Sequence, residues 1–390
     1  MLKNLNHIVT FICAGCAVAA WLIGCGTVRV ERSLIVRADD WLMYGGSVGR
    51  TNVASYEVRP PLTQHWEYEA GGGFGGSSPA VTDSMVIVGT LSGELHVVSL
   101  RSGKRAGYSD LGAAIVGTPV IEGDAVYVAL TRTRRSLVAY DVRTGEIIWG
   151  SELGDIETSP LVLSRRLYVT TMDGRLICAN QTDGNVKWTF SVPSDQNKTA
   201  IRSSPAADST AIFFGADDGK LYAVALADGK LRWTVGTDGS VVAAPTVRDG
   251  RVYVGSLDNH LYAVEAATGI VVWKRNLGSR IYGSQAVDEQ RVVVGTADGT
   301  VFCLDAASGD IRWQYRAKSV VNSAPMISGK VVFIGSLDKS LYAIDADTGA
   351  LLWTKAFEGR IRGTPVVWKN ELIIQVEDRS IIALKSEGGM

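Results

Sequence analysis

One short motif recurs along this chain at a nearly constant interval. A small residue is followed by proline at seven places, and an eighth copy carries glutamine in the proline position. Successive copies lie 40, 41, 45, 40, 40, 40 and 40 residues apart, and their small residues are Ser78, Thr118, Ser159, Ser204, Ala244, Ser284, Ala324 and Thr364. A fixed period of this length indicates a fold built from stacked copies of one unit, so the usual estimate of domain number from length does not apply.

Each unit contains four short apolar segments rich in valine, isoleucine, tyrosine and tryptophan, which favour β-strands. An Asp-Gly pair such as Asp218-Gly219 separates the second segment from the third, and this dipeptide favours a tight hairpin turn. A second turn ends in glycine four residues before a tryptophan, which is Trp149, Trp188, Trp233, Trp273, Trp313 or Trp353. Each unit is therefore expected to form a four-stranded antiparallel sheet.

The pattern predicts an all-β fold, an eight-bladed β-propeller of four-stranded antiparallel blades. No helical periodicity of apolar residues appears after residue 40, and a four-stranded unit of about 40 residues is typical of a propeller blade. The last unit stops after residues 381–384, whereas residues 62–68 supply a strand ahead of the first unit. The N-terminal strand is expected to close the last blade and cover its edge. A seven-bladed ring with one decayed unit is the alternative.

The first unit departs from the others in one position. Gly107 stands where its siblings carry tryptophan. The interface beside that strand is therefore expected to be the weakest of the ring.

The N-terminus has the layout of a targeting segment. Lys3 precedes an apolar run that holds no charged residue before Arg29. The run ends in Leu22-Ile23-Gly24-Cys25, which resembles a bacterial lipobox with Cys25 as the lipidated residue. We expect residues 1–24 to be a lipoprotein signal peptide, residues 25–40 a tether and residues 41–390 the propeller. An uncleaved transmembrane anchor is the alternative, since the run approaches the length that spans a bilayer.

Composition excludes several classes of protein. The formal net charge is -1, which argues against a basic nucleic-acid binder and against an acidic disordered tail. Five cysteines and four histidines are scattered without metal-ligand spacing, so no metal or other cofactor is expected. Cys178 and Cys303 lie three units apart and are expected to be buried apolar residues rather than a disulfide. A monomer is expected.

The pattern Ala-x-Asp-x-x-Thr-Gly-x-x-x-Trp occurs at residues 139–149 and 343–353. It resembles the repeat of the pyrroloquinoline-quinone-type (PQQ-like) propeller family, and the resemblance covers roughly residues 41 to 385. Residues 41–46 are also similar to the opening of quinone-dependent dehydrogenases. Those enzymes carry adjacent cysteines and a calcium-binding carboxylate set, and this chain has no Cys-Cys pair. The resemblance therefore favours a protein that is not an enzyme.

The lipobox, the single propeller and the chain length together resemble the BamB family of outer-membrane assembly lipoproteins. This resemblance implies a propeller that binds the periplasmic POTRA domains of BamA through loops on one face. It carries over to Arg202, which ends the longest loop between units, residues 191–202. The family has acidic residues at the entry to the next blade, whereas this chain has residues 239–244 without a carboxylate.

Eight residues are expected to ring the mouth of the central channel. Each lies two positions before a small residue of the recurring motif, and alternation along the innermost strand turns it toward the channel. They are Gly76, Val116, Glu157, Arg202, Val242, Tyr282, Asn322 and Arg362. Two arginines and a carboxylate there predict a partner-binding or anion-binding mouth, with Arg202, Glu157, Tyr282, Asn322 and Arg362 as candidate contacts. A solvated rim without a ligand is the alternative. The basic run 132–135 is expected on the same face.

These features predict a non-catalytic scaffold that is lipid-anchored at the periplasmic face of the outer membrane. Its expected partners are BamA-like POTRA domains and, through the lipid, the membrane, with no nucleic acid. One alternative is a quinone-dependent oxidoreductase or quinone-binding sensor. The other is a periplasmic or surface ligand-binding module.

Overall fold

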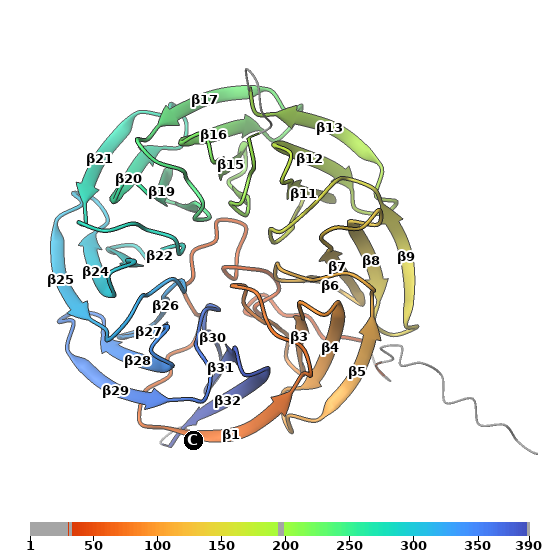
Figure 1. Ribbon diagram of the computed structural model, residues 1–390, viewed down its shortest axis with the longest axis horizontal. Helices are drawn as coiled ribbons and strands as arrows, with labels where there is room; N and C mark the ends of the chain where they lie inside the picture. Colours follow the sequence, from red (N-terminus) through yellow and green to blue (C-terminus); the bar gives the residue numbers. More distant parts are fainter. Residues whose placement is uncertain (1–29, 31–32, 194–198, 388–390) are drawn as a thin grey trace, which may run out of the picture.

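The computed structural model describes residue 30, residues 33–193 and residues 199–387. These residues form eight four-stranded sheets arranged as blades around a central axis (Figure 1). The prediction of an all-β, eight-bladed propeller with antiparallel blades is confirmed. The predicted signal peptide and Cys25 lie outside the described residues, as do residues 194–198 of the longest loop between blades.

The first four blades follow chain order from the innermost strand outward. Blade 1 consists of β2 (Ala80–Val81), β3 (Met85–Gly89), β4 (Glu94–Ser99) and β5 (Arg105–Asp110). Blade 2 consists of β6 (Val120–Glu122), β7 (Ala125–Ala129), β8 (Leu137–Asp141) and β9 (Glu146–Ser151). Blade 3 consists of β10 (Leu161–Leu163), β11 (Arg166–Thr170), β12 (Arg175–Asn180) and β13 (Val186–Ser191). Blade 4 consists of β14 (Ala206–Ala207), β15 (Ala211–Gly215), β16 (Lys220–Ala225) and β17 (Leu231–Gly236).

The remaining blades repeat the order, and the last one closes the ring. Blade 5 consists of β18 (Thr246–Arg248), β19 (Arg251–Gly255), β20 (His260–Glu265) and β21 (Val271–Asn276). Blade 6 consists of β22 (Ala286–Val287), β23 (Arg291–Gly295), β24 (Thr300–Asp305) and β25 (Ile311–Arg316). Blade 7 consists of β26 (Met326–Ser328), β27 (Val331–Gly335), β28 (Ser340–Asp345) and β29 (Leu351–Ala356). Blade 8 consists of β30 (Val366–Trp368), β31 (Glu371–Val376), β32 (Ser380–Ser386) and the N-terminal β1 (Leu62–Glu69).

Ring closure occurs as the sequence predicts. Strand β1 pairs antiparallel with β32, from Leu62 opposite Ser386 to Glu69 opposite Ser380. The outer strand of the last blade thus comes from the start of the propeller, and Figure 1 shows the two ends of the colour scale side by side in that blade. Unfolding either end therefore opens the ring, which ties the stability of both termini together.

Five of the recurring tryptophans donate a hydrogen bond to the next blade. The indole Nε1 of Trp66 donates to the carbonyl of Leu100 in blade 1 at 2.7 Å, and Trp313 donates to Ala346 in blade 7 at 2.8 Å. The ring packs on the glycine that ends the neighbouring turn. A Cβ on Gly349 would lie 2.8 Å from the Trp313 ring, and its φ of +74° also disfavours other residues. These two requirements explain why a glycine recurs at the end of this turn.

The small residue of the motif has a separate role at the inner edge of the blades. In four blades its hydroxyl accepts a hydrogen bond from the main-chain N–H of the equivalent residue one blade earlier. Thr118 accepts from Ser78 at 2.9 Å, and Ser159 accepts from Thr118 at 2.8 Å. These hydrogen bonds link blades 1 to 4 in series and blade 5 to blade 6, close to the axis.

A non-repeating stretch, residues 41–58, occupies the axis and is called the axial segment below. Its main chain pairs with the innermost strands of several blades in turn, as the orange trace at the centre of Figure 1 shows. Trp41 exchanges two hydrogen bonds with Val81 in blade 1, and Gly49 accepts from Val247 in blade 5. Asn52 accepts from Ile327 in blade 7. The segment therefore closes one end of the central channel and links distant blades directly.

No helix within the described residues has the length and apolar character needed to cross a membrane.

Candidate functional site

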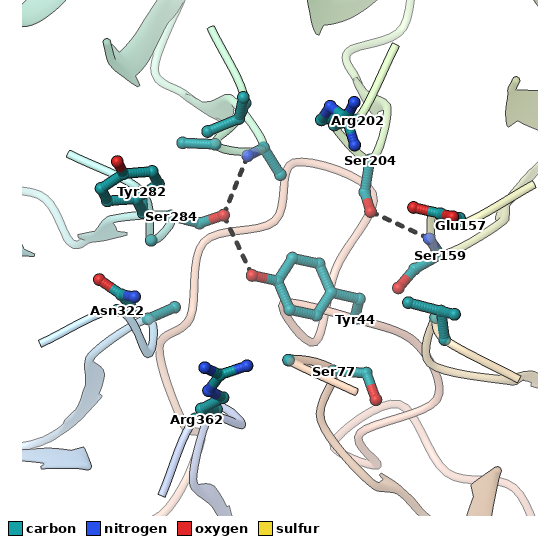
Figure 2. A pocket seen from close by; sticks show the side chains of 18 residues that line it. Tyr44, Ser77, Glu157, Ser159, Arg202, Ser204, Tyr282, Ser284, Asn322 and Arg362 are labelled. Carbon is teal, nitrogen blue, oxygen red and sulfur yellow. Dashed lines mark hydrogen bonds between the residues drawn. The ribbon is translucent and has the colours of Figure 1, made fainter. Parts of the chain in front are cut away.

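The open end of the channel forms a funnel-shaped cavity of about 320 Å³. Its lining includes all eight residues that the sequence places at the channel mouth, one from each blade. The loop that enters each innermost strand carries one of them toward the axis. Figure 2 shows Glu157, Arg202, Tyr282, Asn322 and Arg362 around the opening. We call this cavity the funnel.

The floor of the funnel comes from the axial segment. The Tyr44 hydroxyl donates to Ser284 Oγ at 3.0 Å, and the same oxygen accepts the main-chain N–H of Ala244 at 3.1 Å (Figure 2). Ser284 is the small residue of the blade 6 motif, so one hydroxyl joins the floor to two blades. The floor is thus fixed by hydrogen bonds.

Arg50 lies buried in the axial segment and braces this floor. Its guanidinium carbon lies 5.6 Å from the centre of the Tyr44 ring. Its nitrogens donate only to main-chain carbonyls, those of Tyr44, Ser159, Pro160 and Pro205. Burial lowers the pKa of Arg50 to about 9, because the charged form loses its hydration. The carbonyl oxygens replace that hydration and link the axial segment to blades 3 and 4.

The two arginines at the rim are already paired with carboxylates. Arg202 Nε lies 3.0 Å from Asp217 Oδ2, and Arg362 Nε lies 2.9 Å from Glu377 Oε1. Each acid belongs to the hairpin between the second and third strands of the same blade. Both arginine side chains remain about half exposed. The carboxylates therefore hold the guanidinium groups in place and reduce their net charge, which suits a polar protein contact better than capture of a small anion.

The other rim side chains differ in chemistry around the ring. Tyr282 is 38% exposed and presents an aromatic surface beside the opening. Asn322 Oδ1 is buried and has no hydrogen-bond partner among the described residues. Glu157 borders both the funnel and a second hollow of about 350 Å³. The rim is thus polar and mixed in charge, with one exposed aromatic ring.

The second hollow adjoins the funnel and lies between the β5–β6 loop, the β7–β8 hairpin and Glu157. It is lined by Val116, Glu157 and Arg132, and Arg132 also borders a third hollow with Arg134 and Arg175. The main-chain N–H of Arg132 donates to Asp155 Oδ1 at 2.8 Å, which fixes the start of the basic run. The prediction that this run shares a face with Arg202 is confirmed. The funnel face therefore offers a broad, continuous surface.

The funnel lining does not suit a quinone held by calcium. Glu157 is the one carboxylate among the residues that line it, whereas calcium takes six to eight oxygen ligands from several acidic side chains. No group of three or more His, Cys, Asp or Glu side chains with a metal-binding arrangement occurs in the described part of the chain. The axial segment also fills the channel directly below.

The two described cysteines are structural. Cys178 in β12 and Cys303 in β24 are buried free thiols in separate blades, as the sequence predicts. Burial raises the pKa of Cys303 to about 12 and also raises the pKa of Cys178. Both thiols therefore stay protonated and unreactive near neutral pH.

Comparison with known proteins decides the family. A family model described as outer membrane protein assembly factor BamB matches residues 61–190, 92–234, 193–315, 266–346 and 326–390. These overlapping matches span the whole propeller after residue 60. The chain belongs to this BamB family. The PQQ-like repeat and the BamB resemblance that the sequence indicates are thereby confirmed.

Individual members of the BamB family are distant from this chain. It is 28% identical over 174 residues to outer membrane protein assembly factor BamB of Shewanella oneidensis, covering 40% of this chain and 42% of that protein. Matches to the curated relatives span less than half of their length.

Two solved structures show how widely the fold is shared. BamB from Moraxella catarrhalis superimposes with a TM-score of 0.71 at 20% identity, over 83% of this chain and 99% of that one. The quinohemoprotein alcohol dehydrogenase from Comamonas testosteroni superimposes with a TM-score of 0.77 at 13% identity, over 91% of this chain and 81% of that one. At these identities the structures establish the fold alone.

Sequence reasoning missed two features of the site. One is the axial segment, for which the Gly45-Gly46 pair is a weak turn signal. The other is the pairing at the rim, which leaves a simple trace: an acid stands fifteen residues after each rim arginine, at Asp217 and at Glu377. In each of these blades the arginine lies in the loop before the innermost strand, and the acid lies in the hairpin between the second and third strands.

Proposed function

We propose that this protein is a non-catalytic, lipid-anchored scaffold that assists the assembly of outer-membrane β-barrel proteins. In this proposal Cys25 carries the lipid, and the propeller lies at the periplasmic face of the outer membrane. BamA-like POTRA domains bind its funnel face. The BamB family match along the whole propeller is the observation that carries the proposal.

The funnel face supports a role in protein binding. The closed ring of blades and the hydrogen-bonded axial segment hold the rim loops on a rigid support, which lowers the entropy lost on binding. Arg202, Arg362 and Tyr282 are residue types enriched at interface hot spots, and all three are partly exposed there. Paired, positioned arginines beside an aromatic ring suit a polar partner surface.

The same face gives little support to catalysis. Its single lining carboxylate, Glu157, has no second acid or histidine beside it among the residues of the funnel, so paired acid–base chemistry has no candidate. The quinone alternative also needs a calcium ligand set, which this lining does not offer.

The partner contact is tested with two charge reversals in the same blade. Arg202→Glu places a second negative charge beside Asp217 at the rim, and we expect it to weaken binding of purified BamA POTRA domains by about tenfold or more. Lys230→Glu is the matched control, because Lys230 lies in the β16–β17 turn at the opposite end of blade 4 with its side chain 83% exposed. We expect this control to bind normally and both variants to fold.

Other outcomes would replace the proposal. Equal POTRA affinity of the unaltered protein, Arg202→Glu and Lys230→Glu would show that Arg202 does not contribute to the interface. Absence of POTRA binding by the unaltered protein would contradict the scaffold role. A change in absorbance when pyrroloquinoline quinone and calcium are added would favour the quinone alternative. Anchoring is checked separately: Cys25→Ser should release the protein from membranes, and retention as an integral protein would contradict lipidation.

A further inference from the structure

The interface between blades 1 and 2 lacks the tryptophan that joins other blades. In β5, Gly107 pairs with Val97, which is the register position that Trp149 occupies opposite Ala139 in blade 2. Trp313 occupies the same position opposite Cys303 in blade 6. A glycine offers neither the apolar ring nor the indole N–H, so this interface needs another source for both.

The acceptor that the missing indole would use can be identified from the sibling blades. In five blades the tryptophan donates to the carbonyl of the residue that directly follows the third strand of the next blade, as Trp149 does to Gln181 at 3.1 Å and Trp233 to Ala266 at 3.0 Å. Beside Gly107, the equivalent residue is Val142, which directly follows β8.

The N-terminal chain supplies a donor to that carbonyl. The main-chain N–H of Val30 donates to Val142 O at 2.8 Å. Four residues later, the N–H of Leu34 donates to Asp124 Oδ1 at 2.7 Å, in the turn between β6 and β7. The two contacts hold the chain against the end of blade 2 that lies opposite the funnel.

The same two residues supply the apolar surface. Val30 is 5% exposed and Leu34 is 7% exposed, and both belong to one buried cluster with Ile121, Val126 and Val142 of blade 2. Ile35, the next residue, is 57% exposed. Within the described residues 33–37, Leu34 is thus the one buried side chain.

We propose that Val30 and Leu34 replace the missing tryptophan of blade 1, so that the N-terminal chain is an integral part of the interface between blades 1 and 2. In this proposal the space beside Gly107 is a docking surface, and the N-terminal segment that contains Val30 and Leu34 binds to it.

The contacts that follow extend the docking toward the axis. Arg37 lies 2.9 Å from Asp83 in the turn between β2 and β3. The Asp40 carboxylate accepts from Trp368 Nε1 in blade 8 at 2.8 Å, and Trp41 then begins the axial segment. The described part of the predicted tether is therefore held along the end of the propeller opposite the funnel.

One consequence concerns orientation at the membrane and rests on the proposed lipidation of Cys25. Val30 lies five residue steps after Cys25, which is a reach of at most about 18 Å. The β8–β9 turn lies at the end of the blades opposite the funnel, because β6 leads away from the funnel, β7 returns to it and β8 leads away again. A docked Val30 would thus hold this end near the membrane and point the funnel away from it.

The replacement is tested by a thermal-unfolding cycle on the soluble chain that begins at residue 26. Leu34→Ala should lower Tm by about 5 °C, because a buried leucine is lost, whereas the exposed control Ile35→Ala should leave Tm nearly unchanged. Gly107→Trp should restore the indole, so that Leu34→Ala in this background shifts Tm by less than about 2 °C. Equal losses in both backgrounds, or equal effects of the two alanine variants, would overturn the proposal.

A second readout remains informative if Gly107→Trp does not fold. Amide hydrogen exchange of a peptide covering residues 33–37 should be slow in the unaltered protein and at least tenfold faster in Leu34→Ala. Exchange at the rate of an unstructured peptide in the unaltered protein would contradict docking. If Gly107→Trp does fold, it should also release this segment.

Orientation has its own test in the lipidated protein on vesicles. A fluorophore on Lys104→Cys, at the end opposite the funnel, should be quenched by a lipid-headgroup quencher more strongly than one on Arg362→Cys. Equal quenching would contradict the orientation. If Cys25 is not lipidated, Cys25→Ser will not change membrane attachment, and the orientation argument fails. The thermal-unfolding cycle uses the soluble chain, so it tests the docking of Val30 and Leu34 independently of lipidation.

Discussion

The tryptophan links between blades make a prediction whose size can be worked out from the structure. Trp313 is 7% exposed and donates to Ala346 O at 2.8 Å, whereas Trp188 Nε1 is buried without a partner among the described residues. Replacing either residue by phenylalanine removes the same number of atoms and keeps an aromatic ring on the neighbouring glycine. The two substitutions therefore differ mainly in one hydrogen bond.

We expect Trp313→Phe to destabilise the propeller by about 1 kcal/mol more than Trp188→Phe, which is the typical net value of one buried hydrogen bond. Part of the cost of Trp313→Phe arises because the Ala346 carbonyl then lies buried without its donor. Trp313→Ala should cost about 3–5 kcal/mol, because it also removes the ring and leaves a cavity between blades 6 and 7.

Urea unfolding followed by far-ultraviolet circular dichroism measures these differences, provided that the slope with denaturant stays constant between variants. Equal destabilisation by the two phenylalanine variants, within about 0.3–0.5 kcal/mol, would refute the assignment of the hydrogen bond as the linking contact. Trp313→Ala with a cost no larger than that of Trp313→Phe would refute the packing argument.

Two further predictions concern the axial segment and the funnel face. Arg50→Met should cost about 2 kcal/mol or more in urea unfolding, because the buried carbonyls of Pro160 and Pro205 lose their donor, and an unchanged midpoint would contradict this role. Burial raises the pKa of Asp258, but hydrogen bonds, foremost from the Tyr262 hydroxyl at 2.6 Å, outweigh it and hold that pKa below its ordinary value. The ionised carboxylate therefore adds stability above about pH 4 that is lost as pH falls through the lowered pKa. The stability difference between the protein and Asp258→Asn should narrow between pH 7 and pH 3, and a constant difference would contradict this account.

The fold could be predicted because the sequence signals that specify a blade recur at a constant interval. The motif around Ser78, the Asp-Gly turns and the spaced tryptophans each recur with the blade, and every copy imposes the same local geometry. Closure by residues 62–68 followed from counting strands, because the last unit lacked one and the N-terminus had one to spare.

The funnel residues could be predicted for the same reason. Alternation along a strand assigns a facing direction, and the repeat carries that direction to all eight blades. The ion pairs of Arg202 and Arg362 were harder to foresee, since they depend on how close two loops of one blade approach. Side-chain type alone left partner binding and anion binding both open, whereas the paired carboxylates favour a protein contact.

The N-terminal contacts could not be predicted because they do not repeat. The axial segment binds to the innermost strands through main-chain hydrogen bonds and through Arg50. Arg50 is buried, and no pattern of charged residues in the sequence predicts its burial. The same holds for Val30 and Leu34, which lie in a stretch that resembles a tether. Gly107 was the one available signal: a missing tryptophan in an otherwise regular series marks an interface that some other part of the chain fills.

The proposed role in outer-membrane protein assembly is tested most directly by recovering the lipidated protein from its own membranes in mild detergent and identifying what accompanies it. The account predicts co-purification of BamA, lost or strongly reduced with Arg202→Glu and retained with Lys230→Glu. Recovery of the intact, membrane-bound propeller without BamA would contradict the account.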